Sequence, residues 1–534
     1  MKRAPWPVLV VVLLILSAMA LRIAAALRPG LWADEIFSLA MATGHSLEHP
    51  AATADSSLGD FIEPREAQSP QVFRRYAEHE EQPAGIRRVI RAVLLSDTSP
   101  PFYYLLLNQW TRRFGTGDAA LRFFSVWWAA LSLPLLWVVG REVGGDRVAW
   151  SACLLFSFSP VATFYSVEGR MYSLLWCLVL GLVWLTLKMS SENRGWPWHG
   201  AVWVLTGVAG LLTHYFFAFV WLACLAWLWL RARPSPRWRG AVLAGLTLLA
   251  VLPWYIEVPA SLARWRVTGG WLEGELQWPW ALARPFLLAG SLLSGRSYLG
   301  GSRWADRVVI GLALVLVIWL VHRGGARRIF SERGLLLWGC LASACAGPLV
   351  FDLLQHTTTT NVPRYVLPAL PAAILLAALA ISQLPPRIQL AALAVVLLAW
   401  LPGSWVVTAA RAPRPWEPYP ELSARVAAWA RPGDVVLVQS IPSGVVGVAR
   451  YLKSEIPLAS WVTQLGTREV PADVERLLHG RRRAAVATIH DLGASDALEA
   501  WLRVNARLLG REKFRSSSAE IAYYGPADGE TFTR

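Results

Sequence analysis

Long apolar runs recur along this sequence, and they constrain what the chain can fold into more than any other feature. Only 16% of the 534 residues are charged, against roughly 25% in soluble proteins. A helix needs roughly 20 apolar residues to cross a bilayer. Runs of about this length lie near 7–27, 119–140, 148–165, 171–188, 199–215, 216–231, 240–256, 306–321, 334–353, 364–382 and 388–407. The pattern predicts an α-helical polytopic membrane protein with about 11 transmembrane helices.

The basic residues of the short loops predict how the chain is oriented. Loops rich in Lys and Arg stay in the cytoplasm. One assignment places every basic loop inside, namely Lys2-Arg3, Arg141 with Arg147, Lys188 with Arg194, Arg231 to Arg239, Arg323 to Arg333, and Arg387. We therefore expect a multi-pass protein of the cytoplasmic (inner) membrane of a bacterium, with its N-terminus in the cytoplasm and its C-terminal domain outside. Because topology accounts for the net charge of +15, we expect no nucleic-acid partner.

The N-terminal run has the features of a membrane anchor. Met1-Lys2-Arg3 precedes apolar residues from Pro7 to about Leu27, and no convincing small-residue cleavage site closes the run. A signal peptide has a shorter apolar core and such a site. We interpret this run as an uncleaved first helix.

Two large segments are expected outside the membrane. The first outer loop, 28–118, has amphipathic stretches at Val72 to Leu95 and Pro101 to Phe114, and the second is typical of a helix in the interface plane. Residues 411–534 alternate helix-like and β-rich runs. We predict a transmembrane catalytic domain over 1–410, which includes that loop, and a C-terminal extracytoplasmic α/β domain over 411–534. Its expected helices and strands are Glu421 to Ala430, Ala472 to Leu478, Ala494 to Val504, Asp434 to Val438, Ala484 to Thr488 and Ala519 to Tyr523.

The five cysteines carry no chemical pattern. All of them lie within apolar stretches and lack metal-ligand spacing. We predict that they are packing residues: Cys153, Cys177, Cys224, Cys340 and Cys345.

An acidic pair, Asp34-Glu35, directly follows the first apolar run and opens the long outer loop. A charged helix end at headgroup level is cheap, which is the structural interpretation of the pair. The functional interpretation is an active site at the outer surface, because other polar and charged residues at the ends of spans fall on that side. These are Asp97, Arg122, Glu168 with Arg170, His214 and Arg364.

Each of these further residues also has a structural interpretation. Asp97 can cap the helix that follows it, and Arg364 can anchor a span by snorkelling. Glu168 and Arg170 can satisfy one another, and His214 can be an interfacial residue. Taken together, acids and arginines at the outer ends of distant spans suit a reaction with a phosphate leaving group and an acceptor hydroxyl.

The motifs at these positions resemble the GT-C superfamily of polyprenyl-phosphate-sugar glycosyltransferases. The branch is the one related to protein O-mannosyltransferases and the lipid A aminoarabinose transferase (family 39-related). The resemblance rests on Trp32-Ala33-Asp34-Glu35, Ser99-Pro100-Pro101-Phe102-Tyr103-Tyr104, Ala120-Leu121-Arg122-Phe123, Glu168-Gly169-Arg170-Met171-Tyr172, Thr213-His214-Tyr215-Phe216 and Arg364-Tyr365.

The resemblance implies an inverting transfer at the outer membrane face. The partners are then a polyprenyl-phosphate sugar donor, an acceptor hydroxyl on a cell-envelope lipid, glycan or protein, and membrane lipids. The sugar is a hexose or a pentose. Asp34 matches the catalytic base, Glu35 its acidic neighbour, and Glu168 a second acid in the outer turn.

The other implied positions bind substrate or metal. The expected substrate-binding residues are Asp97, Tyr103, Arg122, Arg170, Tyr172, His214, Tyr215, Arg264, Arg364 and Tyr365. The position of Asp97 often holds His in relatives. A divalent ion, Mg²⁺ or Mn²⁺, held by Asp34 and Glu168 is a further expectation, since carboxylates suit such ions. Some relatives have Asp where this chain has Glu168.

Three other classes of protein fit the sequence less well. A lipid-linked-sugar transporter or flippase should show polar or broken mid-membrane helices and repeated halves, whereas the acids here gather at one face. A polysaccharide ligase or polymerase of different fold would place its arginines in a late outer loop. The loop 257–305 is of that kind, with Arg264, Arg266, Arg284, Arg296 and Arg303. A membrane sensor with a ligand-binding tail domain would not explain the acidic residues Asp34-Glu35 and Glu168.

Overall fold

The computed structural model describes most of the chain. Its description covers residues 8–97, 99–191, 196–231, 238–268, 270–295, 304–322, 326–408, 417–490, 496–514 and 518–532. Of the positions discussed above, these lie outside the ranges: Met1, Lys2, Arg3, Pro7, Arg194, Arg296, Arg303, Arg323 and Ala494. The chain divides into two compact units. We call Met1–Leu27, Arg122–Glu257 and Leu272–Arg411 the helical unit, and Arg28–Leu121, Val258–Trp271 and Ala412–Arg534 the mixed unit.

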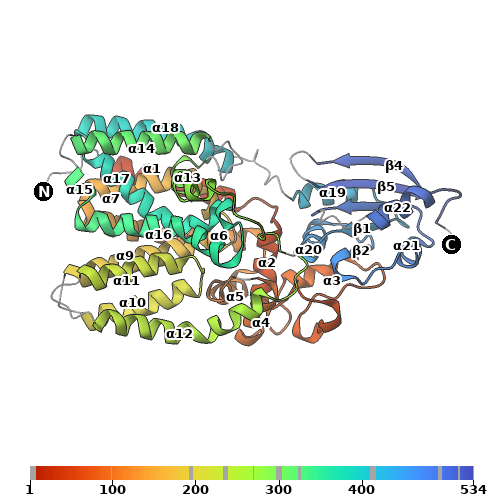
Figure 1. Ribbon diagram of the computed structural model, residues 1–534. Helices are drawn as coiled ribbons and strands as arrows, with labels where there is room; N and C mark the ends of the chain where they lie inside the picture. Colours follow the sequence, from red (N-terminus) through yellow and green to blue (C-terminus); the bar gives the residue numbers. More distant parts are fainter. Residues whose placement is uncertain are drawn as a thin grey trace. The chain divides into compact units, whose positions relative to one another are not determined.

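The helical unit consists of apolar helices joined by short connections (Figure 1). They are α1 (Val8–Ala26), α6 (Asp118–Gly144), α7 (Asp146–Phe158), α8 (Pro160–Ser166), α9 (Tyr172–Ser191), α10 (Trp196–Leu211), α11 (Phe217–Arg231), α12 (Trp238–Leu262), α13 (Trp280–Ser294), α14 (Trp304–His322), α15 (Ala326–Ile329), α16 (Glu332–Gln355), α17 (Leu370–Ser382) and α18 (Pro386–Thr408). Two 3₁₀ segments, η5 (Thr359–Asn361) and η6 (Pro363–Ala369), precede α17.

The predicted class, a polytopic helical membrane protein, is confirmed. Within the described residues, seven helices are long and apolar enough to cross a membrane, or eight if the bent pair α7–α8 is one span. Each of the eleven predicted runs coincides with a helix or with this bent pair. Helix α13 lies inside 257–305, where the sequence predicted a loop. The packing role predicted for the cysteines fits their burial as free thiols.

Three loops that were predicted to be cytoplasmic meet at one carboxylate. Glu142 forms ion pairs with Lys188 at 3.4 Å and with Arg333 at 3.1 Å. Next to it, Arg141 pairs with Asp146. The basic residues that indicated a common side of the membrane therefore lie at one end of the helical unit.

A sharp break between α7 and α8 interrupts one span. The two helices are bent by 62° around Ser159-Pro160, because Pro160 has no N–H to continue the helix. The Ser159 hydroxyl begins α8 by accepting the N–H of Ala162 at 3.3 Å. A break of this kind leaves the last carbonyls of α7 without helical donors.

Arg22 of α1 supplies donors for that break. Its guanidinium donates to the carbonyls of Ser157 at 2.8 Å and Phe156 at 3.2 Å, and to the hydroxyl of Ser166 at 3.2 Å. The Ser404 hydroxyl donates to the next carbonyl, Phe158, at 2.7 Å. Arg22 is 1% exposed, and the charge inside an apolar helix is thereby used to satisfy backbone groups.

The mixed unit joins the first outer loop to the tail of the chain. The loop contributes α2 (Ala33–Ala42), α3 (Pro70–Arg74), α4 (Ile86–Ser96), α5 (Phe102–Phe114), and the 3₁₀ turns η1 (Ala51–Thr53), η2 (Ser56–Leu58) and η3 (Arg75–Ala77). The tail contributes α19 (Tyr419–Trp429), α20 (Pro442–Tyr451), η7 (Thr463–Leu465), α21 (Ala472–Leu478), α22 (Asp496–Asn505), and the strands β1 (Val435–Gln439), β2 (Leu458–Trp461), β3 (Ala484–Thr488), β4 (Ala506–Lys513) and β5 (Glu520–Pro526).

The tail strands form one sheet in the order β2-β1-β3-β5-β4. Strands β2, β1 and β3 are parallel, and β5 runs antiparallel to both β3 and β4. One face packs α21 and α22 against alternate strand residues such as Leu437 and Val486. The six helices and strands predicted for the tail are confirmed within about three residues, whereas α20, β2 and β4 were not predicted.

The first outer loop is tied to the tail by backbone and side-chain contacts. Gln68 pairs with Leu458 as an antiparallel bridge at the edge of the sheet. Arg74 donates to the carbonyls of Ala449, at 2.7 Å, and Leu452. The loop and the tail domain, which the sequence assigned to different domains, thus belong to one compact unit.

The contacts of Arg22 lead to a stability prediction. A buried acceptor that loses its donor costs about 1–3 kcal/mol, and Arg22→Leu removes the donors of two carbonyls at once. We expect Arg22→Leu to lower the apparent Tm of the protein in lipid nanodiscs by several degrees, with a smaller loss for Arg22→Lys, which keeps the charge but not the planar fork.

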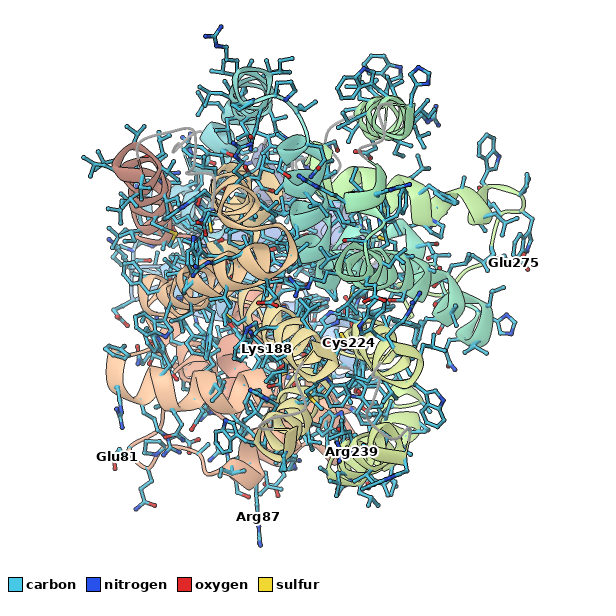
Figure 2. The ribbon with its side chains drawn as sticks, turned by 90° about the vertical axis from the view of Figure 1, so that its left-hand side faces the viewer. Glu81, Arg87, Lys188, Cys224, Arg239 and Glu275 are labelled. Carbon is cyan, nitrogen blue, oxygen red and sulfur yellow. The ribbon has the colours of Figure 1, made fainter. Side chains whose placement is uncertain are left out.

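The matched control is Arg87→Ala. Arg87 is exposed and extends from the surface in Figure 2, and exposed substitutions usually change stability by less than about 0.5 kcal/mol. An equal Tm for Arg22→Leu and Arg87→Ala would contradict the role of Arg22.

Candidate active site

Asp34 and Glu35 lie in the first turn of α2. Glu35 is fully buried, and its Oε2 accepts the N–H of Trp32 at 3.3 Å. This bond satisfies one of the N–H groups that a helix start leaves open. Asp34 is only half-buried. The two neighbouring acids therefore differ in role and in burial. Glu35 is buried and supports the helix start, whereas Asp34 is more exposed to solvent.

The tail domain holds the segment that leads into α2. Glu417 accepts the N–H of Ala33 at 2.6 Å, which places a carboxylate at the positive end of the helix. The Tyr451 hydroxyl accepts the N–H of Leu31 at 2.8 Å and donates to Asp118 at 2.5 Å. Asp118 also accepts the N–H of Gly30 at 2.9 Å. Three successive contacts thus fix the backbone just before Asp34.

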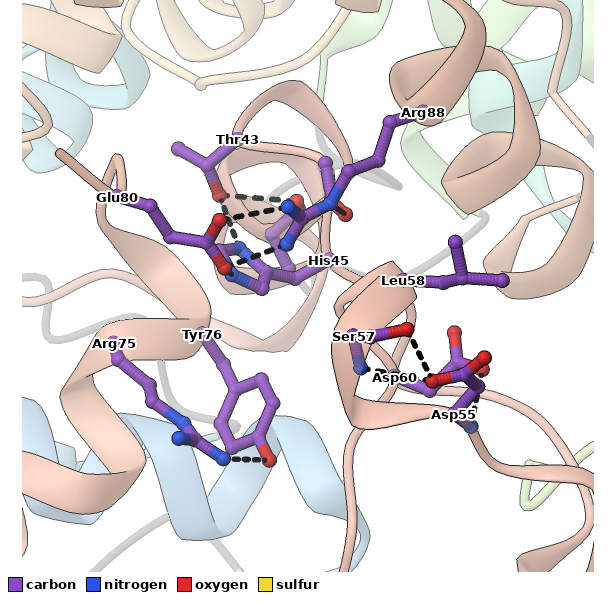
Figure 3. Close-up of polar contacts among 12 residues, drawn as sticks. Thr43, His45, Asp55, Ser57, Leu58, Asp60, Arg75, Tyr76, Glu80 and Arg88 are labelled. Atoms are coloured by element: carbon purple, nitrogen blue, oxygen red, sulfur yellow. Dashed lines mark hydrogen bonds and ion pairs between the residues drawn. The ribbon is translucent and has the colours of Figure 1, made fainter. Parts of the chain in front are cut away.

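The far end of α2 is held by a cluster of polar side chains (Figure 3). The Thr43 hydroxyl lies 3.0 Å from Nδ1 of His45, and Nε2 of His45 lies 3.4 Å from Glu80. Arg88 donates to both oxygens of Glu80, at 2.7 and 2.6 Å. Burial, followed by the Arg88 charge, lowers the pKa of His45 to about 4, so that its ring is neutral at pH 7. Both ends of α2 are therefore fixed.

Two tail residues have pKa values that respond to the Asp34 charge. The Tyr419 hydroxyl is 3.1 Å from Nε2 of His490, and the same nitrogen is 3.4 Å from Glu417. Burial lowers the pKa of His490 to about 4, and the Asp34 carboxylate acts in the opposite direction. Burial also raises the pKa of Tyr419, with the charges of Glu417 and Asp34 contributing. The imidazole and the phenol are therefore neutral at pH 7, and the charge of the candidate base acts on both.

Sequence reasoning missed Glu417, Tyr419 and His490. They lie more than 380 residues after Asp34, and no spacing rule connects them to it. One signal was present, because Thr488-Ile489-His490 places a histidine at the end of a predicted strand. His490 also adopts a left-handed backbone with φ 57°, which is uncommon for a residue other than glycine.

Glu48 is a further acid that the sequence did not single out. It is 1% exposed, and one of its oxygens accepts the N–H of Thr268 at 3.2 Å. Burial raises its pKa to about 7, although the Thr268 and Val267 amides and the Arg266 charge favour the ionised form. A carboxyl group that titrates near neutral pH is typical of functional sites, and of buried structural acids as well.

The other predicted positions of the mixed unit have local roles. Asp97 ends α4 and accepts the N–H of Ser99 at 3.1 Å and the Tyr104 hydroxyl at 2.8 Å. The fully buried ring of Tyr103 meets Tyr104 edge-on at 5.3 Å. Arg264 is exposed just after α12. Asp97 therefore links the end of α4 to the start of α5.

In the helical unit, Glu168 and Arg170 form the turn between α8 and α9. The N–H of Arg170 donates to the carbonyl of Glu168 at 2.7 Å, and the Ser125 hydroxyl donates to the carbonyl of Arg170 at 3.3 Å. Glu168 is 2%, Arg170 7% and Arg122 5% exposed. Arg122 lies on α6, one helical turn before Ser125. Buried charges are rarely retained without a task, so this turn remains a candidate for chemistry.

A second group of predicted residues forms an aromatic cluster. The His214 ring lies 6.2 Å from the ring of Tyr172 and 6.3 Å from that of Tyr365. Tyr365 stacks on Phe216 at 5.0 Å, and its own ring is covered by Arg364 at 5.9 Å. The structure thus brings together three spans at the residues that carry the family motifs.

Tyr215 and Arg364 are placed by neighbours that the sequence did not identify. The Tyr215 hydroxyl accepts the indole N–H of Trp254 at 3.2 Å. Asp352 organises the loop before Arg364, since it accepts the N–H groups of Thr359 at 2.6 Å and Thr360 at 2.9 Å. This buried aspartate fixes the entry to η6, on which Arg364 lies.

The predicted site residues are divided between the units. Asp34, Glu35, Asp97, Tyr103 and Arg264 belong to the mixed unit, and the others belong to the helical unit. Among the described residues, no group of three or more His, Cys, Asp or Glu side chains is arranged to hold a metal ion. The metal role predicted for Asp34 and Glu168 stays a prediction.

The pKa of Glu48 leads to a prediction about pH. The folded state binds this proton more tightly than the unfolded chain, whose glutamate pKa is 4.5. The stabilisation is complete below pH 4.5 and is lost as the pH rises through 7. We therefore expect the Tm of the wild type in nanodiscs to fall between pH 5 and pH 8. The Tm of Glu48→Gln should fall by less over the same range.

Glu81→Gln is the control, because Glu81 is exposed at the surface in Figure 2. It should keep the pH dependence of the wild type. The same pH dependence in Glu48→Gln and in the wild type would disprove the assignment.

Residues 98–256 match the family described as dolichyl-phosphate-mannose-protein mannosyltransferase. This segment contains α5, Arg122, the Glu168 turn and His214. No curated protein sequence matches the chain.

Solved structures resemble the whole chain. ArnT from Cupriavidus metallidurans bound to undecaprenyl phosphate has a TM-score of 0.54 at 13% identity, and the match covers 98% of this chain and 99% of ArnT. ArnT in the apo state gives 0.55 at 14% identity, with 96% and 97% covered. The match includes the tail domain and confirms, for the fold, the resemblance seen in the motifs. The chain therefore shares the fold of ArnT over almost its whole length.

Proposed function

We propose that this membrane protein is an inverting glycosyltransferase. It moves a sugar from a polyprenyl-phosphate-linked donor to a hydroxyl of an acceptor, which is a cell-envelope lipid, glycan or protein. The observation that carries the proposal is the match to ArnT over 98% of the chain, combined with Asp34 at the fixed start of α2. That ArnT structure holds undecaprenyl phosphate. The reaction takes place at the outer face of the cytoplasmic membrane.

Asp34 is the proposed base. The acceptor hydroxyl gives its proton to the Asp34 carboxylate while its oxygen forms a bond to the anomeric carbon. The bond between that carbon and the donor phosphate breaks, and the electron pair leaves with the phosphate. Asp34 suits this role because it is half-buried and its backbone is fixed at Ala33 and Leu31. A phosphate is a good leaving group, so no general acid is required.

Arginines of the helical unit are the proposed phosphate ligands. The departing phosphate gains negative charge, and guanidinium groups in place before the reaction stabilise that charge. Arg364 on η6 is half-buried beside Tyr365, while Arg122 and Arg170 are buried near the Glu168 turn. A basic pocket between spans suits a lipid head group. These roles need no metal ion.

The first test is transfer in vitro. Purified protein in nanodiscs is offered undecaprenyl- and decaprenyl-phosphate sugars with candidate acceptors, and released polyprenyl phosphate is measured. We expect release by the wild type with one donor, and a loss of at least about a hundredfold in Asp34→Asn, in line with the removal of a general base.

Asp55→Asn is the matched control. Asp55 is an exposed acid of the same loop whose side chain bonds only to Ser57 among the described residues, so this variant should keep the activity. Full release by a folded Asp34→Asn protein would exclude Asp34 as the base.

A second test concerns the tail. Glu417→Gln keeps the shape but loses the charged acceptor of the Ala33 N–H. Removing a helix cap costs about 1 kcal/mol, so we expect kcat to fall roughly fivefold with little change in KM.

Glu421→Gln, an exposed acid in the first turn of α19, is the control for that variant. Rescue of kcat by Glu417→Asp would support positioning by the carboxylate. A change in KM alone would contradict it.

A further inference from the structure

The tail sheet has a topological switch point between β1 and β3. After β1 the chain passes through α20 to β2 on one side, and after β3 it passes through α22 to β4 on the other side. In open α/β sheets, ligands bind outside the carboxyl ends of strands at such a point. The carboxyl ends here are Gln439 and Thr488, which are paired in register.

A pocket of about 220 Å³ lies at this place. Its wall includes Gln439, Thr488 and residues of α22, β4 and β5. The side chain of Gln439 is 8% exposed, and its Oε1 accepts the Thr488 hydroxyl at 3.3 Å. Its Nε2 is buried and has no hydrogen-bond partner among the described residues. A buried amide donor without a partner is costly, and here it lines a pocket.

The charges of the pocket select the kind of ligand. Arg511 lies 2.8 Å from Glu499 and 3.4 Å from Glu520, and Lys513 lies 3.8 Å from Glu520. Two cations are balanced by two carboxylates, so the pocket offers no excess charge to a phosphate. It offers donors and acceptors side by side, which suits hydroxyl groups, since each hydroxyl both donates and accepts.

One part of the lining is apolar. Val486 and Ala522 of the sheet, Leu498 and Leu502 of α22, and Tyr524 form this part of the wall. An apolar wall that faces placed polar groups is found in small-molecule sites, and here the polar residues, Ser518 among them, outnumber the apolar ones. This lining fits a sugar ring, whose C–H face is apolar and whose edge carries hydroxyls.

We propose that this pocket binds one sugar residue of the glycosyl acceptor. The assignment of this sugar to the acceptor rests on the proposed function, whereas the binding of a hydroxyl-rich ring does not. The pocket is lined by Thr488, the last residue of β3, and His490 follows two residues later in the chain. His490 contacts Tyr419, and the Asp34 charge raises its pKa against the effect of burial. A glycan held in the pocket is thus bound beside the strand that leads to His490.

The test is direct binding to the full chain in nanodiscs. Methyl glycosides of pentoses, hexoses and amino sugars are titrated by saturation-transfer NMR and calorimetry, with inorganic phosphate as a second probe. We expect one class of glycoside to bind and inorganic phosphate not to displace it. Gln439→Leu removes the unpaired donor and should weaken binding about tenfold, the value of one hydrogen bond.

Two further variants keep the result interpretable. Gln464→Leu changes the same residue type in η7, outside the pocket lining, and should bind like the wild type. If Gln439→Leu does not fold, Thr488→Val replaces it in the test. This variant removes the hydroxyl that orients the Gln439 amide, and it should also weaken glycoside binding. Saturation by no glycoside, displacement by phosphate, or equal affinity in Gln439→Leu and Gln464→Leu would each overturn the proposal.

Binding also separates this proposal from the proposed function. Asp34→Asn should bind the glycoside as the wild type does, because the pocket does not include Asp34. Glycoside binding without any transfer by the wild type would refute the transferase, while the sugar pocket would stand. Competition between the glycoside and the lipid-linked donor would overturn the assignment to the acceptor.

Discussion

A helix that breaks inside a membrane protein must find new partners for its backbone, and this requirement shapes the helical unit. Between α7 and α8 the carbonyls of Phe156, Ser157 and Phe158 lose their helical donors. Arg22 and Ser404, from α1 and α18, replace them. Unsatisfied backbone groups cost several kcal/mol in hydrocarbon, so the three segments must assemble together. The turn that carries Glu168 follows directly after this break.

The same principle applies at the start of α2, with carboxylates as the partners. A helix start exposes N–H groups, and here Glu35 and Glu417 take those of Trp32 and Ala33. Asp34 follows directly after this fixed segment. Its position depends on the tail domain as much as on its own helix.

How far the sequence predicted this structure depends on the range of the interaction. Apolar runs are local, so the helices at the eleven runs and the six tail elements were placed correctly, although only seven or eight of the described helices are long and apolar enough to cross a membrane, against about 11 predicted. Helix α13 was missed because Arg284 and Pro285 interrupt its apolar run. Strand β4 was missed because most of its residues are exposed and do not alternate, and β2 has only four residues.

The candidate site was predictable only where its residues have a local signal in the sequence. Asp34, Glu168 and the aromatic positions stood out because each lies at the end of a span. Glu417, Tyr419, His490 and Glu48 did not, because their significance comes from burial and from contacts across the chain. A carboxylate that titrates near neutral pH, such as Glu48, is created by its surroundings and leaves no mark in its neighbouring residues.

The contact between Glu417 and Ala33 has a consequence for biosynthesis. Its two partners are 384 residues apart, and the sheet that carries His490 is completed only by β5, near the end of the described chain. During synthesis, α2 emerges early but lacks the carboxylate at its first amide until the tail has been translated and folded. The nascent protein therefore passes through most of its membrane insertion before the start of α2 has its final contacts. The start of α2 reaches its final structure only when the tail domain has folded.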